Sequence, residues 1–155
     1  MTIKFENGGD DAPIVENNAG GKQSKAIGDF TLLPKYFSKQ FIKQLSRDLD
    51  EEGAGKAYAS LVDFLEEPDV DLLYDAIDYL SNEPLTIIAR VLEEGLKKKK
   101  YPRDNWKLIS YEDHINHALC HLYMFLKGDI QDRHLDHALA RIALAYETFI
   151  ESEDN

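Results

Sequence analysis

The stretches DHINHALCHL at residues 113–122 and RHLDHALARI at residues 133–142 decide the fold of this chain. The second repeats the first position by position, with histidine at the second and fifth places and Leu or Ile at the third and seventh. Apolar residues spaced three and four apart predict an amphipathic helix. The two stretches contain all five histidines of the chain. The repeat therefore predicts two similar helices, each with a row of histidines.

Each of these helices is expected to carry two stripes on a helical wheel. The apolar seams are Ile115, Leu119, Leu122 and Leu126 in the first helix, and Leu135, Leu139, Ile142 and Tyr146 in the second. The polar stripes beside them are His114, His117 and His121, and His134, His137 and Arg141. The link from Gly128 to Asp132 is short, so the helices should be antiparallel neighbours. Either their polar stripes converge on one histidine-rich site, or both stripes point away.

The remaining sequence predicts more helices and no strand pairs. They are expected from Pro34 to a break at EEGAG (51–55), and over 56–66, 69–81 and 84–99. Ser110 should cap the fifth helix, with Asp113 three residues on, and Gly128 should end it. The sixth should start at Asp129 or Asp132 and run to about residue 150. The fold class is thus an all-α bundle of about five or six helices.

The chain is expected to form one domain with short extensions. Residues 1–29 are rich in Gly, Asn, Asp and Lys without an apolar period, and predict a flexible arm that orders on a ligand or partner. Residues 30–150 are the all-α domain, and 151–155 form an acidic tail. With 43% hydrophobic residues, the domain has enough apolar material for a core.

Composition excludes several classes of protein. A net charge of −11 and a pI of about 4.8 disfavour a phosphate-tracking nucleic-acid binder. No apolar run approaches the roughly 18 residues of a membrane span. The single cysteine, Cys120, rules out an intrachain disulfide and suits a reducing compartment. The start, MTIKFENGGDD, lacks the apolar region of a signal peptide. We expect a cytoplasmic protein, in the host cytoplasm if a phage encodes it.

Clustered histidines next to Asp129, Asp132 and Asp136 are typical of a metal or catalytic site. Imidazole with carboxylate suits Mn²⁺, Co²⁺, Fe²⁺, Zn²⁺ or Ni²⁺ better than an all-oxygen Mg²⁺ site. The alternatives are that the histidines are hydrogen-bonded boundary residues, and that Asp129 and Asp132 only cap helices. Arg141 either holds a phosphate or pairs with a carboxylate of its own helix.

Three other features stay open. The segment around Gly20-Gly21-Lys22 is not a Walker A loop, and presents backbone N–H groups to an anion or is a linker. The acidic stripe Asp71, Asp75 and Asp78 binds metal or is a solvated helix face. Trp106 either plugs the end of the bundle or stacks on a base.

Several motifs together resemble one family. They are Gly20-Gly21-Lys22-Gln23-Ser24, Asn105-Trp106, His114-x-x-His117-Ala-Leu-x-His121, Leu126-x-Gly128-Asp129 and Asp132-x-His134-Leu-x-His137-Ala. The chain resembles, over 17–36 and 84–147, the phage-type dATP/dGTP diphosphohydrolases, which are related to the MazG-like all-α nucleotide pyrophosphohydrolases. Relative to that pattern, residues 44–82 look like an insertion. The helical Glu-x-x-Glu/Asp pairs of MazG-like enzymes are missing, and Glu93 and Glu94 are the nearest candidates.

This resemblance implies a divalent metal (Mg²⁺, Mn²⁺ or Co²⁺) and a purine deoxynucleoside triphosphate as substrate, cleaved between its α- and β-phosphates. No nucleic acid or membrane partner is expected. The expected metal ligands are His121, Asp132, His134 and His137, and the expected catalytic residues are His117, His121 and Asp129. The expected substrate contacts are Lys22, Gln23, Lys25 and Arg141, with Asn105 and Trp106 holding the base. A homo-oligomer is expected, because the arm and the polar stripes can complete a site between subunits.

The rival hypothesis is a non-enzymatic helical adaptor that binds a host or phage protein through its acidic surface. In that case the histidine rows are packing residues. Dependence of stability and turnover on divalent metal distinguishes the two hypotheses, because a ligand that binds only the folded state raises its stability.

Overall fold

The structure is a computed structural model that describes residue 5 and residues 12–153. Its helices are α1 Lys35–Asp48, α2 Glu52–Glu66, α3 Val70–Leu80, α4 Pro84–Lys97, α5 Tyr111–Leu126 and α6 His134–Glu153. Two short 3₁₀ helices, η1 Phe30–Leu32 and η2 Asn105–Leu108, and two strands, β1 Ile14–Glu16 and β2 Lys22–Ser24, complete it. The predicted all-α class is confirmed. Parts of the expected arm (1–4 and 6–11) and of the expected tail (154–155) lie outside the described residues.

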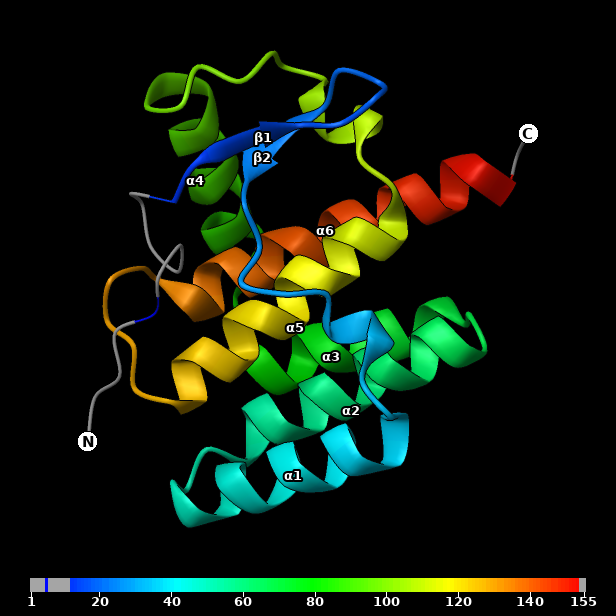
Figure 1. Ribbon diagram of the computed structural model, residues 1–155, viewed down its shortest axis with the longest axis vertical. Coiled ribbons are helices and arrows are strands. Elements are labelled where there is room, and N and C mark those ends of the chain that lie inside the picture. Colours follow the sequence, from blue (N-terminus) through cyan, green and yellow to red (C-terminus); the bar gives the residue numbers. More distant parts are fainter. Residues whose placement is uncertain (1–4, 6–11, 154–155) are drawn as a thin grey trace.

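The central element is the antiparallel pair α5 and α6 (Figure 1). Ser110 caps α5 as predicted, because its hydroxyl accepts a hydrogen bond from the Asp113 N–H. Gly128 follows α5 with a φ of 83°, a conformation that favours glycine. The α6 helix begins at His134, slightly later than predicted. The predicted seam of α5 is fully buried, and Leu139 and Ile142 bury the matching face of α6.

The hydrophobic core lies on one side of this pair, between it and the layer formed by α1, α2 and α3 (Figure 1). Its largest members outside the pair are Tyr58, Leu61, Phe64 and Leu73. Helix α4, the two strands and η2 lie on the opposite side of the pair (Figure 1). No residue of α4 is buried, although its apolar side packs toward α6. The second side of the pair is therefore less closely packed than the first.

The predicted break at residues 51–55 is wrong in part, because α2 already begins at Glu52. Its two glycines are required by close packing rather than by a turn. A Cβ on Gly55 would lie 2.2 Å from the Ser46 Oγ of α1, and one on Gly53 would lie 2.4 Å from the Tyr79 carbonyl oxygen of α3. Glycine, which usually weakens helices, here lets two neighbouring helices approach.

The expectation of no strand pairs is also wrong at one place. The strands β1 and β2 pair antiparallel inside the expected arm, with Val15 opposite Gln23. Each strand has only three residues, too few to show alternation in the sequence. Whether the rest of the arm orders on binding stays a prediction.

The acidic stripe Asp71, Asp75 and Asp78 is exposed on α3, as expected for a solvated face. In the described part of the chain, no helix has the length and apolar character needed to cross a membrane.

Candidate functional site

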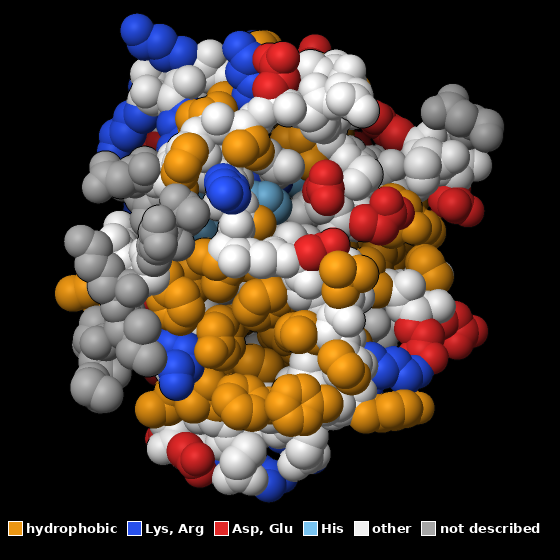
Figure 2. Space-filling view, in the orientation of Figure 1, with side chains coloured by type: hydrophobic (Ala, Val, Ile, Leu, Met, Phe, Trp, Pro, Cys, Tyr) orange, Lys and Arg blue, Asp and Glu red, His pale blue; other side chains and the backbone are white. Residues whose placement is uncertain are grey.

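A cavity of about 550 Å³ lies between the α5–α6 pair on one side and α4, β2 and η2 on the other. This size is typical of small-molecule sites. In Figure 2 histidine atoms are visible in the upper half of the molecule, between basic and acidic side chains. The lining includes four histidines, namely His114, His117, His121 and His137. The polar stripes of the two helices thus converge, which was the first of the two predicted alternatives.

The wall opposite α5 and α6 is built by a tightly bonded turn. The Asn17 side chain accepts hydrogen bonds from the N–H groups of Ala19 and Gly21 and donates one to the Leu108 carbonyl oxygen, at 2.7 Å. A Cβ on Gly21 would lie 2.8 Å from that same carbonyl oxygen. Only glycine therefore lets the turn rest against η2. This packing places β2 over the cavity.

Asn105 of η2 fixes β2 from the other direction. Its carboxamide accepts a hydrogen bond from the Lys22 N–H at 2.7 Å and donates one to the Lys22 carbonyl oxygen at 2.6 Å. The N–H groups of residues 19–22 all donate within the protein. The segment is therefore neither a free linker nor an anion nest.

A group of possible metal ligands lies at the α5–α6 wall. His121 of α5, Asp132 of the link before α6 and His137 of α6 each place one ligand atom within 4.8 Å of the others. The His137 Nε2 also lies 3.1 Å from the Asp132 Oδ1. Burial, with the neighbouring His137 and His134, lowers the pKa of His121 well below its ordinary value. Burial alone would raise the pKa of Asp132, but the hydrogen bond and the charge of His137 lower it. Neutral imidazole and ionised carboxylate are the states that bind metals.

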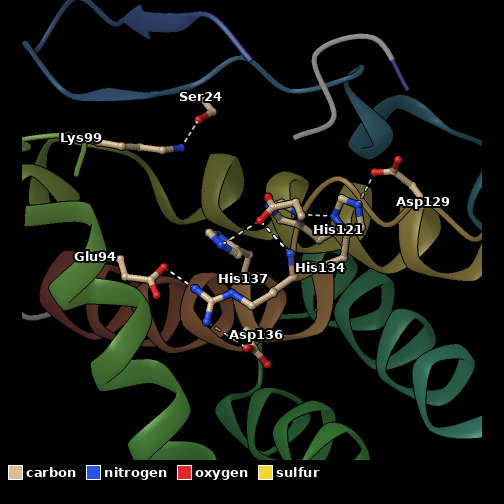
Figure 3. A network of polar contacts seen from close by, with 10 residues as sticks. Ser24, Glu94, Lys99, His121, Asp129, His134, Asp136 and His137 are labelled. Atoms are coloured by element: carbon tan, nitrogen blue, oxygen red, sulfur yellow. Dashed lines mark hydrogen bonds and ion pairs between the residues drawn. The ribbon is translucent and has the colours of Figure 1, made fainter. Parts of the chain in front are cut away.

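Behind this group a buried chain of hydrogen bonds runs from Asp129 through His134 to His121 (Figure 3). The Asp129 Oδ2 lies 2.6 Å from the His134 Nε2, and the His134 Nδ1 lies 2.9 Å from the His121 Nδ1. Because a carboxylate only accepts, the His134 Nε2 carries the proton. When His134 carries only this one proton, its Nδ1 accepts from the His121 Nδ1–H. The lone pair of His121 is then on Nε2, where a cation can bind it.

His134 was predicted as a metal ligand, and the structure gives it a different position. Both of its ring nitrogens are engaged, one by Asp129 and one by His121. Neither His134 nor Asp129 lines the cavity. His134 and Asp129 therefore lie where residues that orient a metal ligand, here His121, are usually found.

A second cluster surrounds Arg141. Its Nη1 donates to the His114 Nδ1 at 3.0 Å, and the His114 Nε2 donates to the Trp106 carbonyl oxygen at 3.1 Å. Burial, with repulsion from Arg141, lowers the pKa of His114 to about 3, so its ring is neutral. Burial lowers the pKa of Arg141 to about 10, and the guanidinium stays charged at neutral pH. Burial likewise lowers the pKa of His117 well below its ordinary value.

The charge of the cavity is opposite to that of the chain. Six basic and four acidic side chains line it, whereas the whole chain has 18 basic and 29 acidic residues. The basic residues of the lining are Lys22, Lys25, Lys98, Lys99, Arg103 and Arg141. Such a site attracts anions in spite of the acidic surface around it.

The structure brings most of the predicted site residues to one cavity. Lys22, Gln23, Lys25, Asn105 and Trp106 line the wall formed by β2, the adjoining chain and η2. Asn105 also lines the cavity, but its carboxamide is hydrogen-bonded to the backbone of Lys22. Its role is therefore to hold β2 in place. The alternative ligands Glu93 and Glu94 also line the cavity, and form ion pairs with Lys97 and Arg133 respectively.

Sequence reasoning missed part of this wall. Lys99 lines the cavity, and its Nζ donates to the Ser24 Oγ at 2.7 Å (Figure 3). Tyr101 lines the cavity beside it, and burial raises its pKa. The run of four lysines at 97–100 was the available signal.

A known protein family matches part of the chain. The model of the family described as dATP/dGTP diphosphohydrolase, N-terminal, matches residues 65–155. The chain belongs to this family. The resemblance stated from the motifs is thereby confirmed, and the name of the family implies a diphosphohydrolase. The match includes residues 65–82, which lie in the segment expected to be an insertion. No curated protein and no solved structure matches the chain.

Proposed function

We propose that this protein is a metal-dependent nucleotide pyrophosphohydrolase that cleaves purine deoxynucleoside triphosphates to the monophosphate and pyrophosphate. One observation carries the proposal. A group of three possible metal ligands opens into the same cavity as a set of basic side chains, in a chain of the dATP/dGTP diphosphohydrolase family. Triphosphates need both features, since they bind as metal complexes and carry several negative charges.

The donor set fits a divalent cation. Two imidazoles and one carboxylate, from His121, His137 and Asp132, suit Mn²⁺ or Co²⁺ better than Mg²⁺. A divalent ion bound there supplies a Lewis acid that neutralises phosphate charge and makes water more acidic. Asp129 and His134 hold His121 in the tautomer that leaves its Nε2 free. We therefore propose Asp129 as a positioning residue rather than as a catalytic one.

The phosphates are held by basic side chains on both walls. Arg141 uses one N–H for His114, and its remaining donors can hold phosphate oxygens bidentately. Lys22 and Lys25 are exposed at the facing wall and can bind the negatively charged pyrophosphate as it leaves. His117, kept neutral by burial, lines the cavity and can accept a hydrogen bond from the attacking water.

The test is a hydrolysis screen of the four common dNTPs with product identification, run with Mg²⁺, Mn²⁺ and Co²⁺. We expect dAMP or dGMP with pyrophosphate from the purine substrates. His137→Ala should abolish turnover while the helical circular-dichroism spectrum is retained. Asp71→Ala, on the exposed face of α3, is the matched control and should keep full turnover. Absence of pyrophosphate with every metal, or undiminished turnover in His137→Ala, would contradict the proposal.

A homo-oligomer remains part of the proposal, with a second copy of this chain as partner. The surface over η1 and α1 is broadly apolar (Figure 2). Leu32, Tyr36, Phe37 and Phe41 are exposed there, with 80% of Leu32 accessible. Large exposed apolar patches often mark interfaces. Light scattering coupled to gel filtration measures the assembly, and a monomer at micromolar concentration would refute this part.

A further inference from the structure

Gln23 of β2 has a buried polar atom that nothing satisfies. The side chain is 9% exposed and lines the cavity. Its Oε1 is, among the described residues, the one buried side-chain nitrogen or oxygen atom without a hydrogen-bond partner. A buried, unpaired acceptor is destabilising, so such atoms are rare in folded proteins unless a ligand satisfies them. The carboxamide of Gln23 therefore has unused hydrogen-bonding capacity at the wall of the cavity.

The other carboxamide of the cavity cannot take this role. Asn105 uses both its oxygen and its nitrogen on the backbone of Lys22, the residue next to Gln23. Asn105 thus fixes the strand, and the fixed strand positions Gln23. A rigid backbone under a free amide is what a site of recognition needs.

His121, Asp132 and His137 are here called the cation group. The position of Gln23 relative to this group indicates which part of a bound nucleotide Gln23 contacts. The metal ligands and Arg141 belong to the α5–α6 wall, and Gln23 belongs to the opposite wall. Figure 3 shows Ser24, the neighbour of Gln23, across from the histidines. Lys22 and Lys25 of that wall are exposed, whereas Gln23 is buried. We therefore place the pyrophosphate end of the nucleotide along the exposed lysines and its base against the buried Gln23.

We propose that Gln23 is the residue that recognises the purine base, and that it accepts adenine and guanine by rotating its amide. At positions 6 and 1, adenine presents a donor and an acceptor, whereas guanine presents an acceptor and a donor. An amide pairs with adenine through Oε1 to the 6-amino group and Nε2 to N1. Half a turn of the same amide pairs Nε2 with the guanine O6 and Oε1 with the guanine N1–H. Amides recognise bases bidentately in this way elsewhere.

This inference rests on the proposed function, because it takes the substrate to be a nucleotide. It also explains a preference between base classes. The corresponding edge of a pyrimidine lies closer to the sugar by the width of one ring, so it stops short of an amide that the rigid strand holds in place. A single uncharged side chain then accepts both purines and disfavours both pyrimidines.

The test compares Gln23→Met and Gln23→Glu with wild type and with Gln40→Glu. Gln40 is exposed on α1 and supplies the same change of charge outside the cavity. Gln23→Met should lower kcat/KM for dATP and dGTP by about tenfold or more, as loss of a bidentate base contact does. Gln23→Glu should raise the dGTP to dATP ratio about tenfold, because a carboxylate accepts from guanine N1–H but cannot donate to adenine N1. Gln40→Glu should change neither value.

Binding measurements separate the failure of this inference from failure of the proposed function. Calorimetry with dAMP, dGMP and inorganic tripolyphosphate needs no turnover. We expect Gln23→Met to lose affinity for both monophosphates and to bind tripolyphosphate as wild type does. Equal binding of dAMP by Gln23→Met and wild type overturns the inference even if wild type hydrolyses dNTPs. No binding of either monophosphate to wild type also overturns it. Absent hydrolysis with intact, Gln23-dependent binding contradicts only the proposed function.

Discussion

The Asp129 Oδ2 lies 2.6 Å from the His134 Nε2, and both side chains are almost fully buried. This pair determines which nitrogen of His121 is free to bind a cation. Asp129 holds the proton of His134 on Nε2, so the His134 Nδ1 accepts a hydrogen bond from the His121 Nδ1–H. The cation group therefore depends on a carboxylate that lies outside the cavity.

The first prediction concerns this carboxylate. Asp129→Asn keeps the size of the side chain but removes its charge, so it no longer fixes the tautomer of His134. Loss of such a supporting carboxylate typically lowers metal affinity about 10- to 100-fold. Calorimetric titration with Mn²⁺ measures the effect. Asp136→Asn is the control, since Asp136 faces Arg133 instead of a histidine. Equal Mn²⁺ affinity in Asp129→Asn and wild type would exclude the positioning role.

The second prediction concerns Arg141. Arg141→Gln can still donate to the His114 Nδ1, but it loses the charge and the bidentate geometry. We expect weaker inhibition by the product pyrophosphate and a fall in kcat/KM of about 10²-fold, as for loss of one charge-stabilising donor. Arg47→Gln, on the exposed side of α1, is the control for net charge. Unchanged pyrophosphate inhibition in Arg141→Gln would remove Arg141 from the phosphate site.

The third prediction concerns stability and pH. The pKa of His114 is about 3 in the folded protein, because burial disfavours the imidazolium. In the unfolded chain it is near 6.5, so between these values the unfolded state binds more protons and stability rises with pH. The contribution of His114 to the free energy of unfolding is fully present above about pH 6.5 and is lost as the pH falls toward about 3.

His114→Gln removes this proton uptake. The free energy of unfolding should then depend less steeply on pH between about 6 and about 4, by up to about 1.4 kcal/mol per pH unit. Urea denaturation at several pH values measures both slopes. Parallel curves for the two proteins would show that His114 is not kept neutral by the fold.

The fourth prediction concerns the turn that carries β2. Gly21→Ala places a Cβ against the backbone of Leu108, and overpacking of this kind costs about 1–3 kcal/mol. The variant should expose the amides of β2 to hydrogen exchange and raise KM for dNTPs. Gly28→Ala is the control, because its added Cβ has only ordinary contacts, the nearest at 3.7 Å. Unchanged exchange in Gly21→Ala would mean that β2 does not need this contact.

The α5–α6 pair could be predicted because its signals are local. The seam repeats at helical spacing, Ser110 caps its own helix, and Gly128 ends it. The short link between the helices limited their arrangement to two outcomes, and the cavity shows convergence. The sequence could not separate metal ligands from supporting residues, because His134 and His137 both belong to the polar stripe of the second helix.

The β2 wall could not be predicted because its causes are not local. Three-residue strands lack a period, and this pair depends on Asn105, far along the chain. The start of α2 was missed for a similar reason. Gly53 and Gly55 indicate a turn in isolation, whereas their helical conformation is fixed by contacts to α3 and α1. Lys99 reaches Ser24 only once both segments are folded.

The most direct test of the cation group is calorimetric titration of Mn²⁺ into wild type and into His121→Ala and His137→Ala, each first stripped with EDTA. The account predicts a bound ion in wild type, a large loss of affinity in both variants, and pyrophosphate release from dATP only in the metal-loaded wild type. Equal Mn²⁺ binding by wild type and both variants, or pyrophosphate release that persists in EDTA, would contradict it.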